Sequence, residues 1–170
     1  ESIKALAKDL KNKAVDVLVN NAGVYDNVKD GGPVFSDLFD ILNVVLIDGV
    51  APRFLAEALL PSLKKGKEKL IVSISSNQGV ISLADKYHSE HWPYGAGKAA
   101  LNFTMATFSK VYPDIKSVLV NPGWMKTRLG GDDAPLETSE AAKKVYKLIV
   151  NHQTKLPDGQ LVGNEGNIIK

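Results

Sequence analysis

The stretch from Lys69 to Gly79, KLIVSISSNQG, decides the fold, because a near-continuous apolar run ends there in a polar loop that contains glycine. Two other apolar runs end in the same way. VDVLV (residues 15–19) runs into NNAG, and SVLVN (residues 117–121) runs into PGW. Strands that are apolar throughout are buried on both faces, as in parallel sheets covered by helices. We therefore expect parallel strands near residues 15–20, 69–75 and 117–121.

Helical patterns separate these runs. Apolar residues recur at helical spacing within residues 2–12, and residues 36–63 form a long apolar-periodic segment. Residues 94–111 form a third helical pattern, and residues 138–151 form a fourth that begins with the good N-cap types threonine and serine. Residues 159–169 predict a last, weaker strand. Alternating strands and helices predict an α/β fold that forms a single domain over residues 1–170.

Composition excludes several classes of protein. The chain has 170 residues, 44% of them hydrophobic and 24% charged, which is typical of an ordinary globular domain. The net charge of +2 is spread along the chain and predicts no nucleic-acid partner. No cysteine is present, so disulfides and thiolate metal sites are excluded. No run approaches the roughly 18 apolar residues of a membrane span. His88 and His91 have no ligand set nearby, so no metal site is expected.

A tyrosine and a lysine lie four residues apart in WPYGAGKAALN (residues 92–102). On a helix, Tyr94 and Lys98 would share one face. A nearby ammonium stabilises phenolate and lowers the tyrosine pKa, which makes the phenol usable for proton transfer. Gly95 and Gly97 are poor helix formers and indicate that something approaches this turn closely. Taken alone, the pair leaves open a surface tyrosine beside a solvated lysine.

The pair occurs within a longer series of motifs. The order NNAG, SISSNQG, YGAGK, NPGWMKT resembles the short-chain dehydrogenase/reductase family over nearly the whole chain, and it is most similar to the carbonyl-reductase and C-factor-like branches. The resemblance implies a Rossmann-like doubly wound parallel sheet. It also implies an oxidoreductase that moves a hydride between a nicotinamide cofactor and a carbonyl or alcohol substrate. NADP(H) is favoured by this branch, and NAD(H) stays open.

The resemblance also implies a catalytic group. Tyr94 would be the general acid, or the base in the reverse direction. Lys98 would lower the pKa of that tyrosine and hydrogen-bond the nicotinamide ribose. Ser76 would orient the substrate carbonyl. It is preferred to Ser75 because the serine of the family is followed by x-x-Gly, and Gly79 lies three residues beyond Ser76.

Further residues would contact the cofactor and the substrate. Asn20 would support the sheet, and Ala22 and Gly23 would let the cofactor pass close to the backbone. Loop PGWMKT would cover the nicotinamide, with Thr127 meeting its carboxamide; its expected cofactor-binding residues are Pro122, Gly123 and Thr127. Two tryptophans, Trp92 and Trp124, would line a substrate pocket, and simple loop packing is an equal alternative for Trp92.

One position departs from the family pattern. The family has an asparagine thirteen residues before the proline that ends the long helix, and thirteen before Pro61 stands Asp48, which fits this register better than Asn43. We therefore include Asp48 in the expected catalytic group. A role of the main-chain carbonyl would survive this exchange, whereas a side-chain amide donor would not, so Asp48 is either functional or merely tolerated.

A second departure concerns the phosphate-binding turn. The family's Gly-x-x-x-Gly-x-Gly turn, which binds the cofactor pyrophosphate, does not occur in the sequence. The resemblance implies that the first three strands and two helices are absent and that residues 1–170 are the C-terminal two-thirds of the fold. We expect a portion of a longer chain or a truncation, with a natural short form of altered strand pairing as the alternative. VDVLV would then lie at the edge of the sheet.

The missing turn leaves two functions open. One is the dehydrogenase/reductase described above, and the other is a non-catalytic fragment or binding subunit that cannot hold the cofactor by itself. The expected partner is a small carbonyl or alcohol substrate in the cytoplasm, with neither nucleic acid nor membrane. The assembly stays open between monomer, homodimer and homotetramer.

Overall fold

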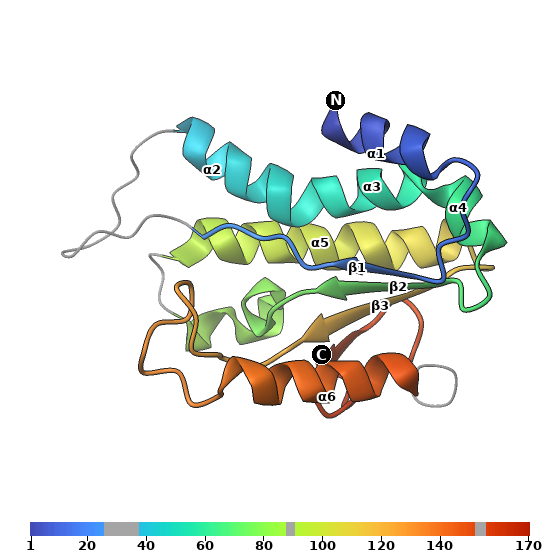
Figure 1. Cartoon of the computed structure of the whole chain (residues 1–170). Helices are drawn as coiled ribbons and strands as arrows, with labels where there is room; N and C mark the ends of the chain where they lie inside the picture. Colours follow the sequence, from blue (N-terminus) through green and yellow to red (C-terminus); the bar gives the residue numbers. More distant parts are fainter. Residues whose placement is uncertain (26–37, 88–90, 152–155) are drawn as a thin grey trace.

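The computed structural model describes residues 1–25, 38–87, 91–151 and 156–170. Four parallel strands form one sheet in the order β1-β2-β3-β4 (Figure 1). Their bounds are Val17–Asn20 for β1, Leu70–Ile74 for β2, Lys116–Asn121 for β3 and Leu161–Gly163 for β4. Val72 of β2 is aligned with Val19 on one side and Val118 on the other. The predicted parallel strands are therefore confirmed, and the weak fourth strand spans three residues.

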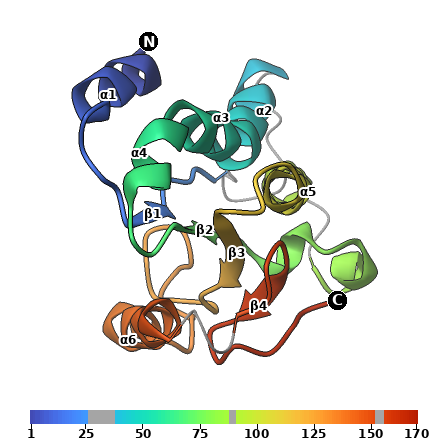
Figure 2. The same ribbon diagram turned by 90° about the vertical axis from the view of Figure 1, so that its right-hand side faces the viewer.

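Helices cover both faces of the sheet (Figure 2). Helix α5 and the segments before it lie on one side, and α6 lies on the other. The helical bounds are Ser2–Leu10 for α1, Leu38–Val45 for α2, Leu46–Val50 for the π-helical turn η1, Ala51–Ala58 for α3, Leu60–Lys65 for α4, Trp92–Val111 for α5 and Thr138–Val150 for α6. Two short 3₁₀ helices, η2 (Asn77–Gly79) and η3 (Ile81–Lys86), follow β2. Within the described ranges, none of these helices combines the length and the apolar character that crossing a membrane requires.

The long apolar-periodic segment of residues 36–63 is helical over most of its described length, but it is divided into several pieces. The turn η1 interrupts it at Leu46–Val50, and Leu59 leaves the helical conformation before α4 begins. Pro61 lies in the first turn of α4, where its missing N–H leaves no hydrogen bond unmade. Residues 36 and 37 of the predicted segment lie outside the described residues.

Successive residues of β2 serve the two faces of the sheet. Ile71 packs into a core with Met105 and Phe108 of α5, whereas Leu70 and Val72 pack into a second core on the α6 side. All five of these side chains are fully buried. Burial on both faces explains why the strand is apolar at consecutive positions rather than at alternate ones.

Strand β1 lies at the edge of the described sheet. It pairs with β2 alone among the described strands, and the side chain of Val19 is 44% exposed. The edge position predicted for this strand is therefore confirmed. An unpaired strand edge offers its backbone groups to another strand.

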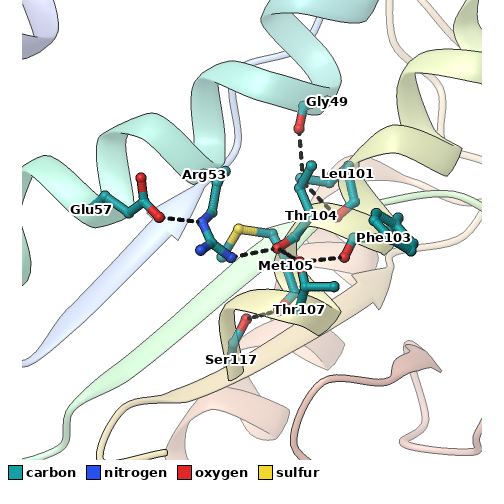
Figure 3. A network of polar contacts seen from close by, with 9 residues as sticks. All are labelled: Gly49, Arg53, Glu57, Leu101, Phe103, Thr104, Met105, Thr107 and Ser117. Atoms are coloured by element: carbon teal, nitrogen blue, oxygen red, sulfur yellow. Dashed lines mark hydrogen bonds and ion pairs between the residues drawn. The ribbon is translucent and has the colours of Figure 1, made fainter. Parts of the chain in front are cut away.

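A network of polar contacts fixes α5 against its neighbours (Figure 3). Arg53 of α3 donates from Nη1 to the carbonyl of Thr104 at 2.9 Å, and Thr104 Oγ1 donates to the carbonyl of Gly49 at 3.0 Å. On the sheet side, Ser117 Oγ donates to the carbonyl of Met105 at 3.3 Å. These bonds hold the second half of α5 between α3 and β3, and they thereby set where its first turns lie.

Candidate active site

The first turns of α5 carry the tyrosine and the lysine. Pro93 occupies the first turn, where its fixed φ angle suits a helix start. Tyr94 is 9% exposed and Lys98 is 4% exposed. The alternative of a solvated surface pair is therefore wrong. Both side chains lie inside the molecule, near the carboxyl ends of β1 and β2.

Glycines allow three backbone segments to meet at this point. A Cβ atom on Gly79 would lie 2.5 Å from the backbone carbonyl carbon of Lys98, and one on Gly49 would lie 2.6 Å from the Cβ of Ala100. A Cβ on Gly97 would lie 3.1 Å from the Cβ of Asp48. The close approach that the glycines of α5 predict is confirmed at Gly97. The approaching group is the turn η1 of the protein itself.

Ser76, rather than Ser75, meets the tyrosine. Ser76 has an extended backbone at the start of η2, its Oγ accepts the N–H of Gln78 at 3.2 Å, and its side chain lies close enough to Tyr94 to lower the pKa of the phenol as a hydrogen-bonding group. The hydroxyl of Ser75 is buried and donates to Asn102 Oδ1 at 2.6 Å. The preference for Ser76 that rests on the x-x-Gly spacing agrees with this geometry.

Lys98 is held by a carboxylate and a carbonyl. Its Nζ lies 3.2 Å from Asp48 Oδ2 and donates to the carbonyl oxygen of Ile74 at 3.1 Å. The same Nζ lies 5.4 Å from the centroid of the Tyr94 ring. Asp48 is fully buried, and its Oδ1 accepts the backbone N–H of Val24 at 2.8 Å. Asp48 therefore joins the loop after β1 to helix α5.

The pKa of Tyr94 is raised well above its ordinary value. Burial is the largest cause because it disfavours the charged phenolate, and the nearby carboxylate of Asp48 raises the pKa further. The hydrogen bond with Ser76 acts in the opposite direction. The pKa is thus raised in this arrangement instead of lowered as expected, because burial disfavours phenolate and the ammonium of Lys98 is paired with a carboxylate that itself repels phenolate.

An aromatic residue of the site was missed by the sequence analysis. The ring of Tyr25 lies 4.9 Å from that of Tyr94 and 5.0 Å from that of His91, measured between centroids, with tilted planes in both cases. Tyr25 follows NNAG by two residues. An aromatic residue so soon after a predicted strand end is the signal that would have placed it at the site.

The strand end at NNAG lies beside the ion pair. Asn20 is buried and donates from Nδ2 to Ser73 Oγ at 3.1 Å, which links β1 to β2. Ala22 and Gly23 are exposed. A Cβ atom on Gly23 would lie 3.4 Å from Asp48 Oδ2 and 3.5 Å from Lys98 Nζ, so this backbone passes directly over the pair.

The loop after β3 is held by its own hydrogen bonds. Gly123 has a φ of +93°, which favours glycine, and the carbonyl of Pro122 accepts from Asn164 Nδ2 at 2.9 Å. Thr127 Oγ1 accepts the N–H of Gly130 at 2.9 Å. The conformation of the loop is therefore fixed by contacts within the protein itself.

The two tryptophans lie at the surface. The indole N–H of Trp124 donates to the carbonyl of Gly130 at 2.7 Å, and its side chain is 58% exposed. Trp92 begins α5 and is also exposed. His88 lies outside the described residues. Within them, no group of three or more histidine, cysteine, aspartate or glutamate side chains could hold a metal ion.

The residues at this edge of the sheet suit part of a nicotinamide cofactor. An ammonium has three N–H donors, and two of those of Lys98 face Asp48 and Ile74, which leaves one for a ribose hydroxyl. The exposed backbone at residues 22–23 lies next to it. The hydroxyls of Ser76 and Tyr94 are of a type that can hydrogen-bond a substrate oxygen. This donor set fits the nicotinamide half of the cofactor.

Comparisons with known proteins identify the family of the chain. The family model described as short chain dehydrogenase matches residues 1–137. The C-signal of Myxococcus xanthus is 32% identical over 149 residues, which cover 86% of this chain and 87% of that protein. Short-chain dehydrogenase srdF of Neurospora crassa is 33% identical over 146 residues, and the match covers 79% of this chain but 57% of srdF.

Solved structures resemble the whole of the chain. An NADPH-bound carbonyl reductase from chicken fatty liver superposes with a TM-score of 0.82 at 30% sequence identity. The superposition covers 99% of this chain and 72% of the chicken protein. The chain thus corresponds to a little under three-quarters of that fold.

Proposed function

The chain belongs to the short chain dehydrogenase family of oxidoreductases, and on that premise we propose that Ser76, Tyr94 and Lys98 form the catalytic group of an NADP(H)-dependent carbonyl reductase. The choice of carbonyl substrate and of NADP(H) is supported by the likeness to the chicken carbonyl reductase, which binds NADPH. NAD(H) is the second cofactor to test.

One observation carries the proposal. The hydroxyl of Tyr94 is buried, Ser76 lies close enough to lower its pKa as a hydrogen-bonding group, and the ammonium of Lys98 lies 5.4 Å from the centroid of the Tyr94 ring. When bound, a reduced nicotinamide would supply a hydride to the carbonyl carbon. Tyr94 then gives its proton to the carbonyl oxygen, and Ser76 holds that oxygen in place.

Cofactor contacts are proposed for the nicotinamide half. Lys98 would bind the ribose, the backbone of Ala22 and Gly23 would pass beside it, and Thr127 would meet the carboxamide. Asn20 supports this edge from within the sheet, and Pro122 and Gly123 shape the covering loop. Trp92 and Trp124, both exposed, are proposed to contact the substrate.

A second candidate is a non-catalytic binding protein of the same fold. One observation favours it. The C-signal, of which the match covers 87%, is named as a signal rather than as a dehydrogenase.

A titration and an assay separate the two candidates. The protein is titrated with NADPH and with NADH while nicotinamide fluorescence is followed, and NADPH consumption is then measured with a panel of aldehydes and ketones. The reductase is expected to bind NADPH and to consume it only when a carbonyl compound is present. Failure to bind either cofactor, in a protein shown by circular dichroism to be folded, would favour the binding protein.

The assembly proposed is a homodimer. Large apolar side chains remain exposed on the outer side of the helices before α5 and on α5 itself, namely Leu38, Leu42, Leu46, Val50, Phe54 and Phe103. Exposed apolar side chains gathered on neighbouring helices favour an interaction site. Light scattering is expected to give twice the monomer mass, and a monomer at high concentration would contradict the proposal.

A further inference from the structure

Asp48 lies at the position where the family resemblance implies asparagine, and its environment differs from that of a tolerated replacement. Its carboxylate is fully buried, and each of its two oxygens faces a donor. Oδ1 accepts the N–H of Val24, and Oδ2 lies 3.2 Å from Lys98 Nζ. Asp48 Oδ2 has an ionic partner but no hydrogen bond of good geometry, which makes the ion pair its main interaction.

An asparagine would not serve both donors. An amide has one acceptor oxygen and one NH₂ group, so one of the two positions would place a donor against a donor. Either the N–H of Val24 or the ammonium of Lys98 would then lose its partner. The observed contacts therefore require a carboxylate.

The carboxylate changes the charge that Tyr94 meets. The titratable groups described around Tyr94 are Asp48 on η1, Lys98 on α5 and Tyr25 after β1, with His91 in ring contact with Tyr25. The single positive charge of Lys98 is balanced by Asp48 at 3.2 Å. No net positive charge from this group is left to stabilise a phenolate, and the carboxylate repels one.

We propose that Asp48 is a positioning residue that pairs with Lys98 and so widens, beyond the effect of burial, the pH range over which Tyr94 stays a neutral phenol and can donate a proton to a carbonyl substrate. This inference rests on the proposed function. In the step concerned, the carbonyl carbon gains the hydride of a reduced nicotinamide, which is thereby oxidised. The π electron pair moves to the carbonyl oxygen, which takes the proton of Tyr94, and solvent returns a proton to the phenolate.

The pH dependence of reduction and of oxidation follows from the protonation state of Tyr94. Reduction needs the phenol, so its kcat/KM stays level up to the pH at which Tyr94 ionises. Alcohol oxidation needs the phenolate, so its kcat/KM rises with pH over the same range. The higher the pH at which Tyr94 ionises, the wider the range over which the site works as an acid.

The first test is a titration that needs no activity. Tyrosinate absorbance is followed against pH in the wild-type protein and in Tyr94→Phe, and the difference reports Tyr94 alone. In wild type, Tyr94 is expected to ionise above the ordinary tyrosine value of about 10. In the Asp48→Asn background, the same difference is expected to show an ionisation constant about tenfold larger or more.

Glu57→Gln is the matched control. It removes one carboxylate from α3, the next helix along the chain, where Glu57 is paired with Arg53. This variant is expected to leave the Tyr94 titration unchanged, which separates a local effect of Asp48 from a change in net charge. Should Asp48→Asn fail to fold, the wild-type titration still decides, because ionisation of Tyr94 at or below about pH 10 would overturn the inference.

The kinetic readout distinguishes the two proposals. In Asp48→Asn, the fall of carbonyl-reduction kcat/KM at alkaline pH is expected to move to lower pH by the same factor as the titration. An unchanged pH profile and an unchanged titration in an active enzyme would overturn the role of Asp48 and leave the proposed function standing. A protein that reduces no carbonyl compound, but whose Tyr94 titration responds to Asp48→Asn, would overturn the proposed function and support the assignment of Asp48.

Discussion

The two halves of helix α5 treat buried polar groups in opposite ways. In the first half, Tyr94 and Lys98 contact side chains from other elements, and Asp48 Oδ2 opposite Lys98 has no hydrogen bond of good geometry. In the second half, Thr104 and Ser109 donate to backbone carbonyls. Side chains that hydrogen-bond to backbone carbonyls hold the helix in place. Side chains that contact other ionisable side chains can, in addition, take part in proton transfer.

The largest effect expected from this comparison is on turnover. Tyr94→Phe removes only a hydroxyl and should lower carbonyl-reduction turnover by roughly 10²–10⁴-fold, the usual contribution of a positioned acid. Tyr112→Phe makes the same chemical change at the other end of α5, where the ring packs on Phe108, and should leave turnover unchanged. Steady-state kinetics of both variants provide the check. Equal losses in the two would remove the distinction between the halves.

The next effect is on stability. Lys98→Met leaves Asp48 buried without its counter-charge and should lower the free energy of unfolding by about 3–5 kcal/mol. Adding Asp48→Asn should restore part of that loss. Ser109→Ala, in the second half, removes one neutral hydrogen bond and should cost about 1 kcal/mol. Urea denaturation of the single and double variants measures the coupling. Additive losses would mean that the pair does not act as a unit.

A smaller effect is expected in the polar network of the second half. Arg53→Met removes the bond to the Thr104 carbonyl, the pairing with Glu57 and the stacking of the guanidinium over Phe108 at 5.0 Å. The loss should be about 1–2 kcal/mol in unfolding free energy, with turnover per folded molecule retained. The control is Lys126→Met, which breaks a more exposed ion pair and should change stability by less than about 0.5 kcal/mol. A loss of turnover in Arg53→Met would mean that the second half of α5 also contributes to the active site.

The smallest effect is a pH dependence. The pKa of Tyr94 is raised in the folded protein, so above about pH 10 the unfolded chain loses this proton first. The free energy of unfolding therefore falls as the pH rises, by up to about 1.4 kcal/mol per pH unit, and this loss does not occur below about pH 10. Tyr94→Phe should lack this slope in urea denaturation at alkaline pH. If the free energy of unfolding changed with pH in the same way in wild type and in Tyr94→Phe, the pKa of Tyr94 would not be raised by folding.

Much of the fold follows from local pattern. The consecutive apolar residues of β2 predict its burial on both faces, and proline marks the first turn of α5. The N-cap role expected from the residue types of Thr138 and Ser139 is wrong, because both lie inside α6 and its N-cap is Glu137. The pairing of Ser76 with Tyr94 follows from motif spacing, because strand ends of a parallel sheet meet at one edge.

The electrostatics of the site could not be predicted in the same way. The contact between Asp48 and Lys98 depends on how closely η1 approaches α5, which Gly49 and Gly97 permit but which no spacing in the sequence specifies. Burial and, after it, the carboxylate of Asp48 reverse the expected direction of the Tyr94 pKa. Tyr25 was missed for a similar reason, since its ring meets Tyr94 only after the loop beyond β1 has folded over the ion pair.

The turn η1 has a consequence for helix phase. Besides Gly49, the buried residues on the segment from α2 to α3 occupy every fourth position, at Val44, Asp48, Pro52 and Ala56. Exposed apolar residues have the same spacing at Leu42, Leu46, Val50 and Phe54. In a uniform α-helix a spacing of four drifts by about 40° at each step, or about 120° over three steps. A π turn accommodates one extra residue, which amounts to about 100° of rotation and cancels most of that drift.

Deleting one residue within η1 would turn everything before the deletion relative to everything after it by about 100°. Either Val44 or Ala56 would then leave the core, or Asp48 would swing away from Lys98. The length of this segment, counted to the single residue, is therefore what aims the carboxylate at the ammonium.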